Sequence, residues 1–527
     1  RYMKMLYDRA GSDEDKPRFL LLFGDGAWDN RMRTTDWRTT STDDFLLCYE
    51  SENSFSETKC YVSDDYFCLL DDDEGADMVT DKIDAAVGRF PARTVHEAAI
   101  LVDKTVSYRI NDHAGAWENT ICFMGDDGDK NRHMNDAEMV ANIVESNYPG
   151  YNIKKIYWDA YTRYGDAAGS KYPEVTSLIR QQMQDGALIM NYSGHGNPSG
   201  LSHENVLHLS DYKLSSDMHL PLWITASCDI MPFDGQEENI GETAIFNPDG
   251  GAIAFFGTTR TVYTGDNQNM NCAFLKHVMA TETDGRRRTL GDAVRLSKNE
   301  LRYMGFESKR INKLHYSLLG DPALRLAAPQ MSIVIDSING QAVGSDVVTL
   351  NAGKAVSVAG HVEGGSNFNG VVSLTVSDVE QVVTCRLNET GKDGASTPFT
   401  FTDRPVTLYN GQDSIRQGRF SQTFVLPQDI SYSDDTGRMT IYALSNDRSL
   451  AANGSCDDFT MGSDAELTSD GIGPSIYCYL NTADFQNGGT VNTTPYFYAE
   501  LTDKDGINAA GSSVGHDLEL TVDGDPA

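Results

Sequence analysis

Short apolar runs alternate with helix-like stretches over residues 1–328. Continuous apolar runs end in polar or glycine turns at 18–26, 119–129 and 187–196, and apolar residues recur at helical spacing over 95–110. Strands that alternate with helices predict βαβ units and a mostly parallel sheet. Because these strands are apolar at successive positions, we expect the sheet to be buried on both faces.

Beyond residue 328 the pattern changes to short strands bounded by Gly, Asn, Asp and Ser, such as "AVSVAGHV" at 355–362. Strands at this spacing are typical of an immunoglobulin-like β-sandwich. A polar, turn-rich stretch at 453–475 predicts a linker, and a further β unit begins near Ser475. The chain is therefore expected to join an α/β half to an all-β half.

The composition indicates a globular protein with an acidic surface. Hydrophobic residues make up 40% of the 527 residues, more than a disordered chain contains, and no apolar run approaches the ~20 residues of a membrane span. The net charge of −34 argues against nucleic acid as a partner, because phosphates are contacted by Lys and Arg. The acidic loop at 69–81 is a candidate for a structural Ca²⁺, although it lacks the EF-hand ligand order.

Nine cysteines are scattered without CxxC pairs, which argues against a structural zinc site. Their odd number leaves at least one thiol outside any disulfide, and such a thiol can be a nucleophile. A disulfide between two of Cys48, Cys60 and Cys68 stays open. The chain starts at Arg1 and ends in what reads as a strand, so we expect a piece of a longer polypeptide.

Residues suited to chemistry follow three of the expected strands. "FMGDDGD" carries Asp126, Asp127 and Asp129, "NYSGHG" carries His195, and "WITASCD" carries Cys228 and Asp229. The carboxyl ends of strands in an open parallel sheet collect functional sites. There an imidazole can take the proton of a thiol, the thiolate can attack a carbonyl, and a carboxylate can orient the ring. On residue type alone, a buried inert cysteine and an ordinary loop histidine remain alternatives.

"NYSGHG", followed by "ASCD" with Cys228 33 residues after His195, resembles the His and Cys signatures of the gingipain-type cysteine peptidases, in the clan that also holds caspases and legumain. Four further stretches match that family in the expected order: "LLLFGDGAWDNR", "DAAVGRFPART", "GGAIAFFGTTRTVY" and "LLGDPALRL". Within the family, "TASCDIMPFD", "ENIGETA", "GTTRTVY" and "GINAAGSSVGHDLELTVDGD" (506–525) are similar to the cell-surface sortases of the type IX secretion system.

The resemblance implies a caspase-like α/β fold, a mostly parallel sheet flanked by helices in two subdomains, followed by an immunoglobulin-like sandwich and the start of a further β domain. The expected domains are an N-terminal α/β subdomain, a catalytic α/β subdomain, the sandwich, and a linker with a partial β domain, at 1–118, 119–328, 329–462 and 463–527.

The resemblance also implies roles for single residues. Cys228 would be the nucleophile, His195 the general base, and the N–H of Gly196 an oxyanion donor. Asp127 is the first choice for the acid that orients the ring, and Asp126 the second.

A further strand end carries residues for which the resemblance suggests contact with the substrate: Thr258, Thr259 and Arg260. The alternative for Arg260 is a simple ion pair with a carboxylate.

A sortase of this kind would cleave cargo proteins before their C-terminal secretion domain and transfer them to anionic lipopolysaccharide. It would stay at the bacterial cell surface through outer-membrane attachment-complex proteins such as PorV, and it would require no cofactor. Two alternatives remain: a secreted endopeptidase that only hydrolyses, and a catalytically silent scaffold, against which the presence of both His195 and Cys228 speaks.

Overall fold

The fold was analysed in a computed structural model of the chain. It describes all residues except 53–55, 57–58, 167–168, 303–310, 345–346, 389–393, 428–429, 431–432, 463–472, 474, 487, 493–494, 503–520, 523–524 and 527. The chain divides into two compact units. The first comprises Arg1–Gln330, Val383–Phe401 and Asp447–Ala451, and the second comprises Met331–Val382, Thr402–Asn446 and Ala452–Ala527.

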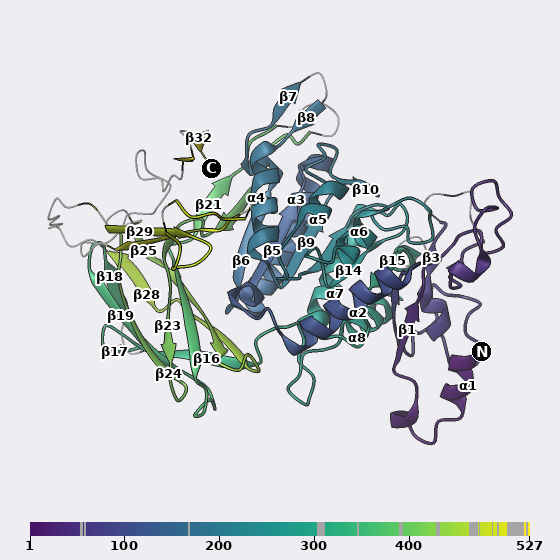
Figure 1. Ribbon diagram of the computed structural model, residues 1–527, viewed down its shortest axis with the longest axis horizontal. Helices are drawn as coiled ribbons and strands as arrows, with labels where there is room; N and C mark the ends of the chain where they lie inside the picture. The colour runs from purple at the N-terminus through teal and green to yellow at the C-terminus, as the bar shows by residue number, and fades with distance from the viewer. Residues whose placement is uncertain are drawn as a thin grey trace. The chain divides into compact units, whose positions relative to one another are not determined.

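The first unit is built on an eight-stranded sheet with the order β1-β4-β15-β14-β13-β9-β5-β6 (Figure 1). Neighbouring strands are parallel except for the β14–β15 pair, so two parallel blocks meet there in opposite directions. This mostly parallel sheet with flanking helices confirms the predicted α/β fold class. Its strands are β1 (Phe19–Phe23), β4 (Ala86–Phe90), β5 (Thr120–Gly125), β6 (Asn152–Tyr157), β9 (Ile189–Ser193), β13 (Leu222–Ala226), β14 (Ala254–Thr258) and β15 (Tyr316–Leu319).

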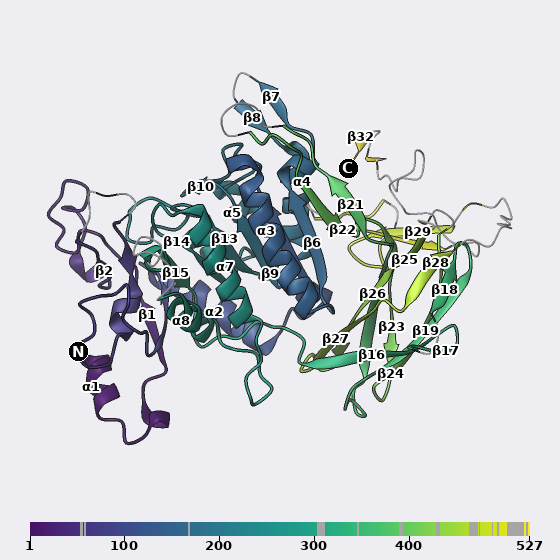
Figure 2. The ribbon, with the colours of Figure 1, turned by 180° about the vertical axis from the view of Figure 1, so that it is seen from behind.

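Helices cover both faces of this sheet, as the continuous apolarity of its strands predicts. Ile121 and Phe123 of β5 belong to one core, with α3, α7 and α8, whereas Cys122 and Met124 belong to the other, with α4, α5 and α6. Figure 2 shows α3 and α7 on the face that lies behind α4 in Figure 1. The helices are α1 (Tyr2–Asp8), α2 (Val95–Ile110), α3 (Gly128–Asn147), α4 (Pro173–Asp185), α5 (Leu209–Leu214), α6 (Ile240–Phe246), α7 (Thr264–Val278) and α8 (Leu290–Leu301).

Small two- and three-stranded sheets decorate the first unit. Three of these strands, β10, β11 and β12, form the loop that follows His195, with Gly196 of β10 opposite Leu201 of β11. The small strands are β2 (Tyr49–Glu50), β3 (Val62–Ser63), β7 (Tyr164–Asp166), β8 (Gly169–Lys171), β10 (Gly196–Asn197), β11 (Gly200–Leu201) and β12 (Leu207–His208).

The second unit is all-β, as predicted. A large, mostly antiparallel sheet runs in the order β23-β20-β26-β27-β16-β19-β24, with β17 paired to β16, and β18, β28 and β25 form a smaller sheet. The strands after residue 330 are β16 (Met331–Ile338), β17 (Gln341–Ala342), β18 (Val348–Asn351), β19 (Ala355–Val362), β20 (Gly370–Ser377), β21 (Gln381–Thr384), β22 (Thr400–Asp403), β23 (Thr407–Ile415), β24 (Arg419–Val425), β25 (Ser433–Thr436), β26 (Arg438–Ser445), β27 (Ala451–Cys456), β28 (Phe459–Gly462), β29 (Ser475–Leu480), β30 (Phe497–Thr502), β31 (Thr521–Val522) and β32 (Asp525–Pro526). Of these, β21 and β22 each belong partly to the first unit, and Ala451 of β27 does as well.

The start of the predicted linker at 453–475 is wrong, because strands β27 and β28 occupy 451–462. Cys456, Phe459 and Met461 are buried in the core of the second unit. This stretch is mostly polar in sequence, but alternate residues of a strand face the same side, so a few apolar side chains suffice to pack β27 and β28 against the core. Most of the 506–525 motif lies outside the described residues.

A fully buried arginine ties the strand β4 to the segments that pack over the sheet. Arg89 donates to both carboxylate oxygens of Asp64, at 2.7 Å each, and to the backbone oxygens of Gly24 and Leu47. Its side chain is 0% exposed and that of Asp64 is 6% exposed. Such a pair stabilises the fold only while both partners are present, since either charge alone would be buried without compensation.

Replacing Arg89 by Met is therefore expected to lower the free energy of unfolding by about 3–5 kcal/mol. All five tryptophans of the chain lie before residue 330, so their fluorescence during urea denaturation reports the first unit alone. The matched control is Lys213→Met, which removes an exposed ion pair with Glu238 and should change stability by less than about 1 kcal/mol. Equal urea midpoints for the two variants would contradict the structural role of Arg89.

Candidate active site

The register of two neighbouring parallel strands places His195 and Cys228 at the same edge of the sheet. Ser193 at the end of β9 pairs with Ala226 at the end of β13, so each of the two residues follows its strand by two positions. The N–H of Gly194 donates to the backbone oxygen of Ala226 at 3.3 Å and continues the pairing past the strand ends.

Gly196 lies directly against the segment that carries Cys228. A Cβ atom on Gly196 would come within 2.5 Å of Oγ of Ser227 and of Cδ1 of Ile230, so only glycine fits without a shift. The backbone turns sharply after Cys228, because Asp229 has a left-handed φ of 49° and its N–H donates to the backbone oxygen of Arg260. The two loops are thus held in contact, while the oxyanion role of Gly196 stays a prediction.

The thiol and the imidazole are partly buried, and burial disfavours the charged form of each. Burial raises the pKa of the Cys228 thiol, and burial lowers the pKa of His195 against the opposing charge of Asp126. Sγ of Cys228 lies 3.5 Å from the backbone oxygen of Val262. Among the described residues no hydrogen bond joins the thiol to the His195 ring, whose Nε2 lies 3.7 Å from Oδ1 of Asp129.

Asp126, the second choice for an orienting acid, is a buried anchor for the histidine loop. Its carboxylate accepts from the backbone N–H of His195 at 2.7 Å and bonds to Nδ1 of His133. The hydroxyl of Tyr192 lies 2.7 Å from the backbone oxygen of His195 and 3.1 Å from the same carboxylate. Burial by itself would raise the pKa of Asp126, but His133 and His195 hold it below its ordinary value.

Asp127, the first choice for this acid, points to a different set of partners. Its carboxylate accepts from the hydroxyl of Tyr172 at 2.7 Å and lies 3.6 Å from Arg163. Burial, with the charge of Glu204, raises the pKa of Asp127 to about 7. The structure does not bring Asp127 to the His195 ring in any hydrogen bond or ion pair between described residues; Asp129 is the carboxylate beside that ring.

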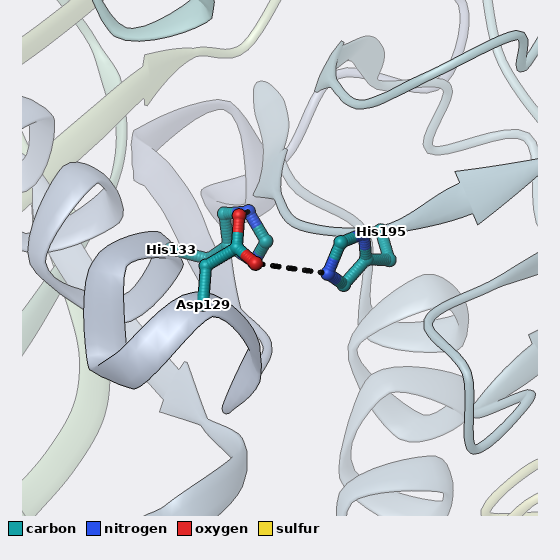
Figure 3. A group of neighbouring side chains, drawn as sticks. All are labelled: Asp129, His133 and His195. Carbon is teal, nitrogen blue, oxygen red and sulfur yellow. Dashed lines mark ion pairs between the residues drawn. The ribbon is translucent and has the colours of Figure 1, made fainter. Parts of the chain in front are cut away.

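Two histidines beside His195 were missed by the sequence analysis. The His133 ring stands edge-on to His195 at a centroid distance of 4.7 Å, and the His203 ring stacks on it at 4.2 Å. Figure 3 shows Asp129 and His133, both from the beginning of α3, opposite His195, which belongs to the loop after β9. The spacing of Asp129 and His133, four residues apart at a helix start, was the signal available in the sequence.

The beginning of α3 has an unusual backbone that carries Asp129 to the site. Asp129, Lys130 and Asn131 have left-handed φ angles of 52°, 60° and 67°. Left-handed geometry costs a non-glycine residue roughly 1–2 kcal/mol. Gly128 just before them has no room for a side chain, since a Cβ would lie 2.8 Å from Cδ2 of His195.

Two of the three residues predicted to bind substrate, Thr258 and Thr259, have supporting positions. Thr258 and Thr259 are fully buried, which leaves their side chains no surface for a substrate. The hydroxyl of Thr258 donates to the backbone oxygen of Ser227, next to Cys228, and that of Thr259 donates to His315.

Arg260 forms an ion pair with a carboxylate, as the alternative interpretation of this residue predicts. Its guanidinium donates to both carboxylate oxygens of the buried Asp234, and its side chain is 20% exposed. Glu50 lies 3.7 Å from the same guanidinium. A contact with substrate stays a prediction for this residue.

The calcium and disulfide expectations fall on the acidic segment before β4. Asp71, Glu74 and Asp84 gather there, but Lys82 already lies 2.6 Å from Asp84 and 3.7 Å from Asp71, so calcium stays a prediction. Cys48 and Cys68 are buried free thiols, which leaves no disulfide between these two.

A thiol and an imidazole on adjacent strand ends of a parallel sheet, with carboxylates behind the imidazole, are the layout of a cysteine peptidase. The model of peptidase family C25 matches residues 1–327, more than half of the chain. The chain therefore belongs to this family, the gingipain family of cysteine peptidases, and the resemblance seen in its motifs is confirmed.

Solved structures of this family are similar to the chain. The dimeric latent PorU of Porphyromonas gingivalis is 27% identical over 98% of this chain and 43% of its own, with a TM-score of 0.35. The Arg-specific gingipain R (RgpB) is 14% identical over 88% of this chain and 87% of its own, with a TM-score of 0.48. The complex of the P. gingivalis RgpB pro- and mature domains is 14% identical over 88% of this chain and 89% of its own, with a TM-score of 0.47.

This chain thus spans less than half the length of the PorU chain. A search of curated proteins matched none of them. Among the described residues, no helix is both long and apolar enough to cross a membrane.

Gly128→Ala tests whether the close approach of α3 positions the His195 ring. The added methyl group should push the ring aside and lower the rate of peptide cleavage by about 100-fold, since small misplacements of a catalytic group have effects of this size. The control is Gly165→Ala, where a Cβ meets nothing within 4 Å and the rate should not change. A wild-type rate for Gly128→Ala would mean that the ring tolerates the displacement.

Proposed function

We propose that the chain is the peptidase part of a cell-surface sortase of the type IX secretion system, similar to PorU. It would remove the C-terminal secretion domain of cargo proteins and pass the new carboxyl group to an amine of anionic lipopolysaccharide. The observation that carries the peptidase activity is the C25 match, which includes His195 and Cys228 on adjacent, in-register strand ends. The sortase assignment rests on the stretches around Cys228 and Arg260 that resemble that subgroup.

The reaction would proceed through an acyl-enzyme. As Sγ of Cys228 bonds to the carbonyl carbon, His195 accepts the thiol proton, and the ring then gives this proton to the leaving amine as the peptide bond breaks. The N–H of Gly196 would stabilise the negative oxygen that forms meanwhile. In the second half, His195 takes a proton from the acceptor amine or from water, and Sγ leaves as the new bond forms.

The His195 ring is oriented for this role by its surroundings. Nε2 faces Asp129, so Nδ1 is the nitrogen left to exchange a proton with the thiol. Asp126 fixes the backbone of the same residue, and the stacked His203 limits rotation of the ring.

Anchoring at the outer membrane would rest on partner proteins such as PorV. Structural Ca²⁺ in the acidic segment remains part of this proposal as an expectation. A protein that kept the fold for binding alone would need neither a thiol nor an imidazole at this edge.

Cys228→Ala in cells that carry it as the only copy should abolish processing of tagged cargo. Cargo should keep its C-terminal domain and lose its lipopolysaccharide-linked forms on immunoblots. The control is Cys478→Ala, which removes an exposed thiol of β29 and should leave processing intact. Cargo that is still trimmed and anchored by Cys228→Ala would refute the sortase assignment.

Transfer and hydrolysis can be separated with the purified protein and a peptide that spans a cargo cleavage junction. With increasing concentrations of a small primary amine, mass spectrometry should show a growing share of amide product at the expense of the free acid, because both products come from one acyl-enzyme. A product that is always the free acid would identify a hydrolytic endopeptidase instead. No turnover at all would favour the silent scaffold.

A further inference from the structure

We propose that Asp129, His133 and His195 form a binding site for a transition-metal ion, with Zn²⁺ as its preferred occupant. One oxygen of Asp129 and one ring nitrogen of each histidine lie within 4.8 Å of one another. Figure 3 shows Asp129 and His133 of α3 beside one another and opposite His195, which comes from the loop after β9. No step of the proposed peptidase mechanism requires His133.

The separations suit a small ion with little rearrangement. Nε2 of His133 lies 3.6 Å from Oδ2 of Asp129, and Nε2 of His195 lies 3.7 Å from Oδ1 of the same residue. Ligand bonds of about 2.0–2.2 Å in a tetrahedron place donor atoms about 3.3–3.6 Å apart. The two distances between carboxylate and imidazole are close to this range, whereas the three donor atoms together, within 4.8 Å of one another, must draw closer around an ion.

The orientation of His133 is the second observation in favour of a metal. Its Nδ1 bonds to the buried carboxylate of Asp126, so Nε2 is the nitrogen turned to Asp129 and His195. A carboxylate that holds the far nitrogen of an imidazole is the usual support for a metal-binding histidine, because it fixes the tautomer and makes the other nitrogen a better donor. The His133 side chain is only 3% exposed, so its position is set before any ion arrives.

The donor set selects the class of metal. Two imidazole nitrogens and one carboxylate suit Zn²⁺, whereas Ca²⁺ and Mg²⁺ prefer sets made of oxygen alone. Asp129 is 42% exposed and opens the cluster to solvent, which gives the ion an entry path and leaves a fourth position for water. The site is distinct from the acidic segment considered for calcium.

Zinc at this site would switch off the proposed peptidase. An imidazole that binds a metal through Nε2 carries its proton on Nδ1, so His195 could no longer accept the proton of Cys228. The inhibition rests on the proposed function, whereas the metal site rests only on the three ligands. The two claims can therefore fail separately.

Metal binding is tested by calorimetric titration of chelator-treated protein with ZnCl₂ in the Cys228→Ala background, which excludes the thiol as a ligand. We expect one Zn²⁺ per chain. Asp129→Asn and His133→Gln should each weaken binding by at least about tenfold, the lower limit for residues that merely hydrogen-bond to a ligand. His96→Ala, which removes an exposed histidine of α2, should bind as the parent does.

Because His133 is buried, His133→Gln is interpreted only if its circular dichroism spectrum and melting curve match the parent. If His133→Gln does not fold like the parent, the zinc affinity of Asp129→Asn tests the site, because the Asp129 side chain is partly exposed. Unchanged affinity in Asp129→Asn would overturn the site, and so would an affinity that depends on Cys228 but not on Asp129.

The inhibition is measured as peptide cleavage by the protein with Cys228 intact. Zn²⁺ should inhibit with a constant equal to its dissociation constant, and a chelator should restore the rate. Zinc that binds in calorimetry with the predicted ligand dependence but leaves cleavage unaffected would keep the metal site and refute the role of His195 as the base.

Discussion

A single buried carboxylate, that of Asp126, holds the site together. It is 1% exposed and accepts from the backbone N–H groups of His195 and Gly128, while it bonds to the ring of His133. A carboxylate deprived of water at this depth is tolerated only if such partners replace its hydration. The need to satisfy this one charge therefore fixes the end of β5, the loop after β9 and the beginning of α3 relative to one another.

The pairing of β9 with β13 in the sheet supplies the second constraint. Because β9 and β13 are parallel neighbours in fixed register, a residue two positions beyond one strand lies beside the residue two positions beyond the other. A slip by one residue would send alternate side chains of β13 to the opposite core, where they do not fit. The core on both faces thus protects the relative placement of His195 and Cys228.

The sequence could predict whatever depends on local pattern. The α/β half, the β-rich half and the strand ends that carry His195 and Cys228 follow from periodicity and turn residues within short windows. The orienting acid could not be chosen in this way, because Asp126 and Asp127 are neighbours whose side chains go to opposite surroundings. Burial of Thr258 was equally hidden, since a strand inside a sheet and one at its edge read alike over five residues.

The left-handed turn at the beginning of α3 explains why Asp129, one of the three carboxylates expected at this strand end, was not chosen as the one beside the His195 ring. A regular helix from Gly128 onward would carry Asp129 along another path, and only the three strained residues bring it within 3.7 Å of Nε2. Strain of this kind persists where surrounding contacts outweigh it, and it concentrates at functional sites. Here the surroundings are the buried Asp126–His133 bond on one side and Gly128 against the ring on the other. The backbone at this point is thus determined by the demands of the site rather than by the helix preferences of its residues.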